Sequence, residues 1–147
     1  MDYSKTQPGR SFIVRFDHND NVIENIIKLA KKENIRCAWI WCLGAVKNAE
    51  IVCGPVETVV PPIPSYHNIQ EANEIVAIGN ISTKDGEPIV HLHSALGRLD
   101  KTRVGCIRKN ADVYLTVECL IMEFADINLK RATNPDLGIN TLVFKKD

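Results

Sequence analysis

The segment Val90-His91-Leu92-His93 places two histidines two residues apart. Side chains in a strand point alternately to its two faces, so His91 and His93 share one face if this segment is extended. Two imidazoles on one face, about 7 Å apart along a strand, can converge on a single cation. The spacing therefore predicts a metal site on a strand.

Cys106 is the candidate third ligand. Residues 97–102 have the composition of a hairpin turn, and pairing that is symmetrical about Leu99-Asp100 places Cys106 opposite His93. Two nitrogens and one sulfur suit zinc, with a fourth position left for water or substrate. A slip of one residue would instead turn Cys106 to the other face. The histidines would then be half-buried hydrogen-bonding residues and Cys106 a small core residue, so both interpretations stay open.

Other polar side chains are weaker candidates for chemistry. Glu118 lies with Tyr114 and Thr116 on the polar face of a predicted strand. It could act as a general acid or base, or as a hydrogen-bond partner of a metal-bound histidine, although a solvent-facing carboxylate explains it equally well. Five cations surround the hairpin after the histidines and could bind phosphate or a small anion, with a solvated rim as the alternative: Arg98, Lys101, Arg103, Arg108 and Lys109.

Length and composition predict one folded domain over residues 1–147. The chain has 18 Lys and Arg against 18 Asp and Glu, and apolar residues make up 45% of it. These values exclude a disordered, collagen-like or coiled-coil chain. The net charge of zero removes the simplest argument for nucleic-acid binding, which leaves DNA contact to a local basic patch. The sequence also contains no phosphate-binding glycine loop and no nucleophile elbow.

The cysteines and the N-terminus predict a cytoplasmic protein with no membrane contact. Five cysteines occur without a C-x-x-C pair, residues 1–7 are polar, and no apolar run approaches the ~20 residues that span a bilayer. Free thiols without an export signal indicate a reducing compartment.

One amphipathic helix is expected near the N-terminus. Residues 11–16 alternate as in a strand, and residues 22–34 repeat apolar side chains every three or four positions. Asn21 followed by Glu24 resembles a capping box at the start of this helix.

Strands dominate the rest of the pattern. Residues 35–46 and 47–54 predict two strands joined by a hairpin at 46–48, and the prolines of residues 56–70 predict a long surface loop. Further strands are expected at 71–83, 88–96, 103–108 and 112–124, with a turn at 84–87, and two short strands flank a turn at 134–138. The predicted fold class is α+β, a mostly antiparallel sheet with one amphipathic helix.

Several segments in this order resemble the plants and prokaryotes conserved (PPC) domain. They are Ser11-Phe12-Ile13-Val14-Arg15-Phe16, Leu43-Gly44-Ala45-Val46, Ile78-Gly79-Asn80-Ile81-Ser82, Asp85-Gly86-Glu87-Pro88 and Val90-His91-Leu92-His93, with Gly54 between the second and third. The resemblance covers roughly residues 9–124. It implies a homotrimer with a fold similar to that of acetolactate decarboxylase, and an apolar strand with Trp39 and Trp41 is consistent with a subunit contact.

The resemblance also bears on the metal ligands. Several members of that family bind a metal through the two histidines of H-x-H and a third histidine in a following Gly-Gly-His. The corresponding segment here is Val104-Gly105-Cys106, so Cys106 replaces the third histidine. A thiolate keeps the site suitable for zinc, whereas a buried neutral thiol would abolish it.

Two classes of function follow from the resemblance. The first is a homotrimeric DNA-associated or regulatory protein, although the chain has no AT-hook and no helix-turn-helix pattern. The second is a zinc-dependent lyase or hydrolase acting on a small carbonyl or carboxylate compound. In that enzyme, Glu118 would move a proton and Arg15 or Arg103 would hold a carboxylate.

Overall fold

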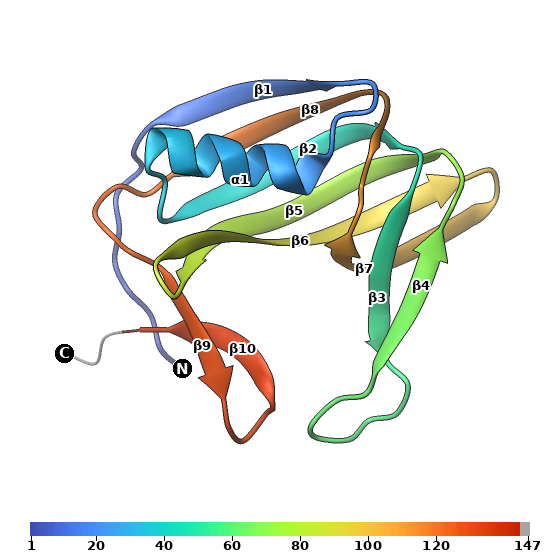
Figure 1. The fold of residues 1–147 in the computed structure, drawn as a ribbon. Helices are drawn as coiled ribbons and strands as arrows, with labels where there is room; N and C mark the ends of the chain where they lie inside the picture. Colours follow the sequence, from blue (N-terminus) through green and yellow to red (C-terminus); the bar gives the residue numbers. More distant parts are fainter. Residues whose placement is uncertain (145–147) are drawn as a thin grey trace.

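A ten-stranded sheet and one helix make up the fold (Figure 1). The computed structural model describes residues 1–144. The elements in chain order are β1 (Ser11–Asp17), α1 (Val22–Glu33), β2 (Ala38–Val46), β3 (Ala49–Pro55), β4 (Pro64–Ile69), β5 (Asn73–Lys84), β6 (Glu87–Arg98), β7 (Lys101–Lys109), β8 (Val113–Glu123), β9 (Lys130–Asn134) and β10 (Ile139–Val143). The main strand order is β1-β8-β2-β5-β6-β7-β3-β4, all antiparallel, and a β9–β10 hairpin joins β5 in parallel. The predicted fold class is confirmed.

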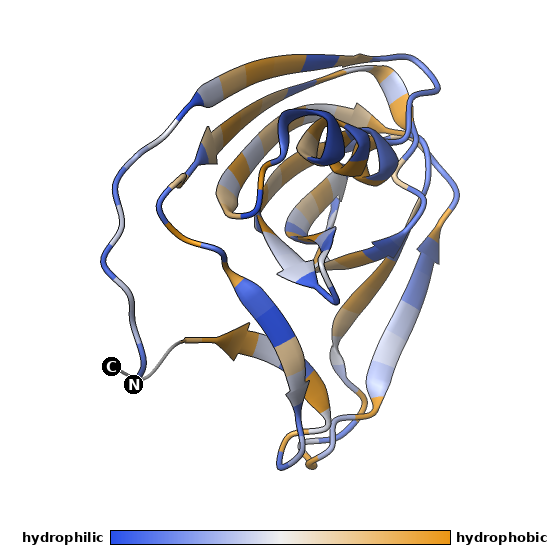
Figure 2. Ribbon diagram, turned by 60° about the vertical axis from the view of Figure 1, so that its left-hand side comes forward, coloured by the Kyte–Doolittle hydropathy of each residue, from blue (hydrophilic) through white to orange (hydrophobic). Residues whose placement is uncertain are grey.

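Helix α1 covers one face of the sheet, which curves around it (Figure 2). The predicted cap is present, because the Asn21 side chain accepts a hydrogen bond from the Glu24 amide at 3.0 Å. Asn34 ends the helix in the left-handed conformation. Val22, Ile26 and Ala30 are buried against inward-facing residues of the sheet, so the hydrophobic core lies between α1 and this inner face. With 12 residues, α1 is too short to cross a bilayer, and residues 1–144 contain no helix that could do so.

Two sequence-based expectations were wrong. Strands β2 and β3 do not pair as a hairpin at 46–48, because β2 lies between β5 and β8 while β3 lies between β4 and β7. The Lys47 amide and the Asn48 side chain instead bond to Asp112, which turns the chain toward the far side of the sheet. Residues 56–70 are not wholly a loop, since β4 forms from residue 64. Strand β4 lies at the edge of the sheet and begins with Pro64, a position where the missing amide hydrogen costs no hydrogen bond to a neighbouring strand.

The hairpins on both sides of β6 were predicted correctly. Asp85 and Gly86, both with positive φ, form the two-residue turn between β5 and β6. Leu99 and Asp100 form the turn between β6 and β7, because Arg98 pairs with Lys101. These turns fix the register of the three central strands, and that register decides which side chains of β6 and β7 meet.

Gly79 lets β5 approach β6 closely at the level of the histidines. It pairs with Leu92, and a Cβ at residue 79 would lie 2.2 Å from the His91 carbonyl oxygen and 2.9 Å from the Leu92 Cα. Both contacts are with backbone, so a side chain could fit only if β6 moved. Gly97 lies in the same strand pair, and a Cβ added there would meet no atom within 4 Å.

We predict that Gly79→Ala destabilises the fold by about 1–3 kcal/mol, the usual cost of overpacking. Gly97→Ala is the matched control and should change the free energy of unfolding by less than about 1 kcal/mol. Urea denaturation followed by circular dichroism measures both. Equal stability of the two variants would show that β6 does not depend on the close approach at Gly79.

Candidate metal centre

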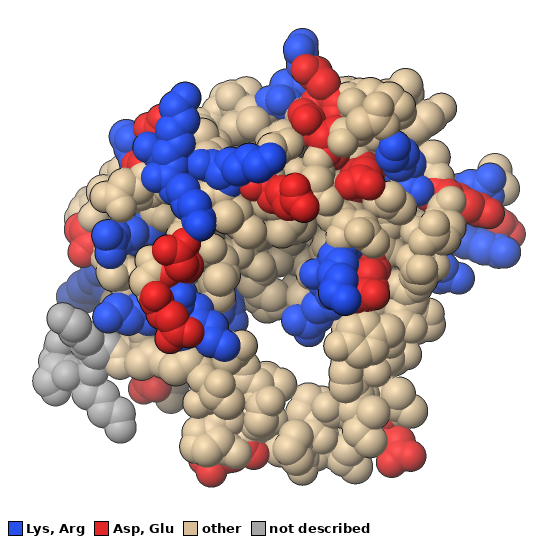
Figure 3. All heavy atoms as spheres, viewed as in Figure 1, with Lys and Arg blue, Asp and Glu red and all other residues tan. Residues whose placement is uncertain are grey.

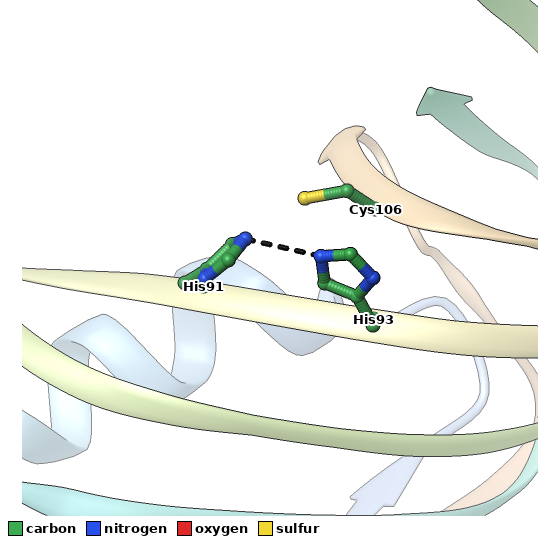
Figure 4. A group of neighbouring side chains, drawn as sticks. All are labelled: His91, His93 and Cys106. Carbon is green, nitrogen blue, oxygen red and sulfur yellow. Dashed lines mark hydrogen bonds between the residues drawn. The ribbon is translucent and has the colours of Figure 1, made fainter. Parts of the chain in front are cut away.

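The two histidines and the cysteine come together on β6 and β7 (Figure 4). His93 pairs directly with Cys106, the register expected from the symmetrical turn. His91 lies two residues earlier in β6 and therefore on the same face. The ligand atoms of the three side chains lie within 4.8 Å of one another.

The two imidazoles face each other through their Nε2 atoms, 3.2 Å apart. Two nitrogens bound at ~2.0 Å to one tetrahedral zinc are about 3.3 Å apart, so this spacing already suits a shared ion. His93 is exposed, His91 is half-buried and Cys106 is buried. The donor set fits zinc, and the exposed side at His93 leaves room for a fourth ligand.

Arg131 of β9 is a site residue that the sequence did not reveal. Its Nη2 lies 3.0 Å from His91 Nδ1 and donates to Asn80 Oδ1 at 3.3 Å, while its Nε donates to Ser82 Oγ at 3.2 Å. Only tertiary structure brings it there, through the parallel contact of Thr83 with Lys130. A basic residue in a short C-terminal strand carried no signal for this role.

Burial and nearby cations disfavour a charged His91. Burial is the main cause that lowers the pKa of His91 from 6.5 to about 4, followed by Arg131, His93 and Arg108. Burial also raises the pKa of the Cys106 thiol, partly offset by Arg108 and Arg131. Metal-free protein therefore presents a neutral imidazole at His91 near neutral pH, and metal binding must remove the thiol proton.

Glu118 and Arg15 lie on the same face as the histidines but several strands away. Glu118 pairs with Arg15 on one side and Leu43 on the other. Three strand spacings separate β8 from β6, roughly 14 Å, so Glu118 does not reach His93 within one chain. Arg15 is one strand farther and forms an ion pair with Asp17 at 2.9 Å. The roles predicted for both residues stay predictions.

Arg103 lies on the opposite face of β7. It pairs with Leu96, three positions from the pair of His93 with Cys106, and an odd separation reverses the side-chain direction. Arg103 lines a hollow of about 410 Å³ together with Arg98 and Lys101. The structure thus separates these three cations from the histidines, whereas Arg108 of the same predicted group lies near enough to His91 to lower the pKa of that imidazole. The function predicted for the basic group is untested.

Comparison with known proteins decides the family. The Plants and Prokaryotes Conserved (PCC) domain, abbreviated PPC above, matches residues 3–125. The chain belongs to this family. The match stops before β9 and β10, so Arg131 lies outside it. Among curated proteins, no relative matches the chain.

Solved structures show the same fold for this PPC protein. A metal-containing protein from Archaeoglobus fulgidus is 24% identical, with a TM-score of 0.88 over 98% of this chain and 100% of its own. A plant- and prokaryote-conserved protein from Pyrococcus horikoshii is 24% identical, with a TM-score of 0.84 and 99% of each chain covered. A protein from Bacteroides thetaiotaomicron, described as a "putative dna binding protein", is 22% identical, with a TM-score of 0.80 over 96% of this chain and 99% of its own.

We predict that His91 in metal-free protein stays neutral down to a pH of about 4. Because the folded pKa lies below the unfolded value of 6.5, His91 stabilises the fold fully above pH 6.5 and this contribution is lost as the pH falls toward 4. Titration of the His91 ring protons by NMR measures the pKa, and Arg131→Gln should raise it. A pKa of His91 near 6.5 in the wild type would contradict the expected effect of burial and Arg131.

Proposed function

We propose that this PPC protein is a homotrimeric zinc-dependent enzyme, of the lyase or hydrolase type, that acts on a small carbonyl or carboxylate compound. The observation that carries the proposal is the convergence of His91, His93 and Cys106 on one open point of the sheet surface. Three protein ligands with a free fourth position are typical of catalytic rather than structural zinc sites. The Archaeoglobus fulgidus protein with this fold is described as metal-containing, which supports the proposal.

The protein's own residues would bind and orient the compound. Zinc, when bound, would polarise a carbonyl oxygen of the substrate. His93 borders a shallow groove of about 650 Å³, which is lined mainly by apolar side chains and extends to Glu118. Glu118 is the candidate for moving a proton.

Self-association would bring Glu118 and Arg15 nearer to a site. Within one chain both residues are too far from His93, so they would act at the histidines of a neighbouring copy. Arg103 lies on the face of the sheet opposite to the histidines. Of the two arginines predicted to hold a carboxylate, Arg15 is therefore the better candidate. These assignments depend on the trimer and are tested with it.

The outer face of the sheet is the proposed subunit contact. Ile13, Leu43, Val76, Ile78 and Val104 are each more than half exposed on β1, β2, β5 and β7. The strand register places them on the face that carries His93, opposite the face covered by α1. An exposed apolar surface of this extent favours burial against protein, and the trimer expected for PPC domains supplies identical copies to cover it.

We predict that Val76→Glu prevents trimer formation. Burying three unpaired carboxylates in an apolar contact costs several kcal/mol, so the variant should sediment as a monomer while the wild type sediments as a trimer. Leu99→Glu is the control, because Leu99 is 90% exposed in the β6–β7 turn. A monomeric wild type, or a trimeric Val76→Glu protein, would contradict the proposed contact.

We predict about one zinc ion per chain in protein purified without chelator. Both His91→Ala and Cys106→Ser should lower zinc affinity by more than about 100-fold, because each removes a ligand rather than an outer partner. Inductively coupled plasma mass spectrometry gives the metal content, and competition with a chromophoric chelator gives the affinity.

His67→Ala and Cys53→Ser are the matched controls for the zinc experiment. His67 lies on β4 and bonds to Ser65, and Cys53 lies on β3, so neither belongs to the His91, His93 and Cys106 group. Both variants should keep the wild-type zinc content. Wild-type protein without metal after incubation with zinc would overturn the enzyme proposal.

DNA association is the second candidate function. The Bacteroides thetaiotaomicron protein with this fold is described as a "putative dna binding protein", which favours DNA association. The cluster of Arg98, Lys101 and Arg103 is the patch that would contact phosphates. Acidic residues weaken this patch, since Arg98 forms an ion pair with Glu71 at 2.9 Å. Basic and acidic side chains are also interspersed over the face shown in Figure 3. Binding to duplex DNA that weakens steeply with increasing salt concentration would favour DNA association over the proposed zinc enzyme.

The proposed enzyme would work in the cytoplasm. All five cysteines are free thiols, including Cys42 and Cys119, whose sulfurs lie 3.2 Å apart without a disulfide. Such a thiol pair persists in a reducing compartment, and so does a cysteine available as a metal ligand.

A further inference from the structure

Arg131 is a half-buried cation without a carboxylate partner in residues 1–144. Its neighbours are neutral groups: Asn80, Ser82, His91 and the Asn140 carbonyl oxygen, which accepts from Nη1 at 3.3 Å. Burial lowers the pKa of Arg131, and Cys106 is the acidic group that opposes this effect. A partly desolvated guanidinium with only neutral partners is well placed to bind an anion.

The contact of Arg131 with His91 fixes the tautomer of that ring. A guanidinium only donates hydrogen bonds, so His91 Nδ1 must accept and the ring proton must sit on Nε2. Metal binding through Nε2 requires the opposite tautomer, with the proton on Nδ1. Arg131 Nη2 would then face an N–H group, and its bond to His91 would be lost.

We propose that Arg131 binds the carboxylate of a small ligand at the metal centre, and that metal binding frees it for this role. The inference rests on the proposed zinc site and names the group that would recognise its ligand. Ser82 and Asn140 hold Nε and Nη1, so the guanidinium stays beside the site when His91 releases Nη2. The freed Nη2 hydrogen and the remaining hydrogen of Nη1 form a pair of donors that matches two carboxylate oxygens.

Charge balance supports the same ligand class. A divalent cation bound to one thiolate and two neutral imidazoles keeps a positive charge, and Arg131 adds another beside it. A carboxylate as fourth ligand would contact both cations and compensate one of the two charges, whereas a neutral ligand compensates neither. The exposed side of the site, at His93, is where such a ligand can enter. Zinc and carboxylate should therefore bind cooperatively, with Arg131 coupling them.

The experiment measures zinc affinity by isothermal titration calorimetry in sodium acetate and in sodium chloride of equal ionic strength. For the wild type we expect zinc to bind at least about 5-fold more tightly in acetate, the lower end of usual coupling between sites. Arg131→Gln should lose this difference. It should also bind zinc more tightly than the wild type in chloride, because a glutamine side chain can accept a hydrogen bond from His91 Nδ1–H.

Arg108→Gln is the matched charge control. Arg108 is exposed and acts on His91 and Cys106 only through its charge, so this variant should keep the acetate effect. Arg131→Lys, which keeps the charge without the planar fork, should keep only part of it. Thermal melts followed by circular dichroism establish that each variant is folded.

The outcomes separate this inference from the proposed function. Zinc binding with the same acetate effect in wild type and Arg131→Gln, or with no acetate effect in the wild type, overturns the role of Arg131 and leaves the zinc site intact. Failure of the folded wild type to bind zinc in either salt overturns the proposed zinc enzyme, and the role of Arg131 with it.

Discussion

The register between β6 and β7 is the constraint on which the site depends. Two short turns, at Asp85-Gly86 and Leu99-Asp100, leave each strand one way to pair with its neighbour. A shift by one residue would move Cys106 to the side of the core and expose Gly105 or Ile107 in its place. The close approach at Gly79 holds β5 against the same strands. Backbone pairing therefore fixes the spacing of the three candidate ligands before any metal is present.

The sequence predicted those parts of the fold and the site that depend on residues close together in the chain, and it missed those that depend on distant ones. Alternation within one strand placed His91 and His93 on one face, and a symmetrical turn placed Cys106 opposite His93, because both are local rules of backbone geometry. The partners of β2 and β3 were not predictable in this way, since Asp112, far along the chain, turns the backbone at residues 47–48. Arg131 was missed for the same reason: its place depends on one parallel contact between β5 and β9.

The outer face of the sheet has two environments, and the metal centre lies at their border. Toward β9, Asn80, Ser82 and His91 are covered by the hairpin that carries Arg131. Beyond His93, the exposed side chains are apolar, as at Val76, Ile78 and Val104. The polar end suits an anionic group, and the apolar end suits the proposed contact with another copy of the chain. A ligand at the open metal position would therefore be recognised from the polar side, which favours a small compound with a carboxylate.

A cysteine as the proposed third ligand, where the family resemblance implies a histidine, changes what the neighbouring residues must do. A thiolate adds a negative charge that a third imidazole would not, and burial opposes that charge in the absence of a counterion. Arg131 and Arg108 supply positive charge near the sulfur, and their effect on the Cys106 pKa opposes that of burial. Arg131 thus has opposite effects on two of the proposed ligands. Its hydrogen bond keeps His91 in the tautomer that cannot bind a metal through Nε2, while its positive charge favours the thiolate of Cys106. This opposition explains how a cysteine could serve as the proposed third ligand beside His91 and His93.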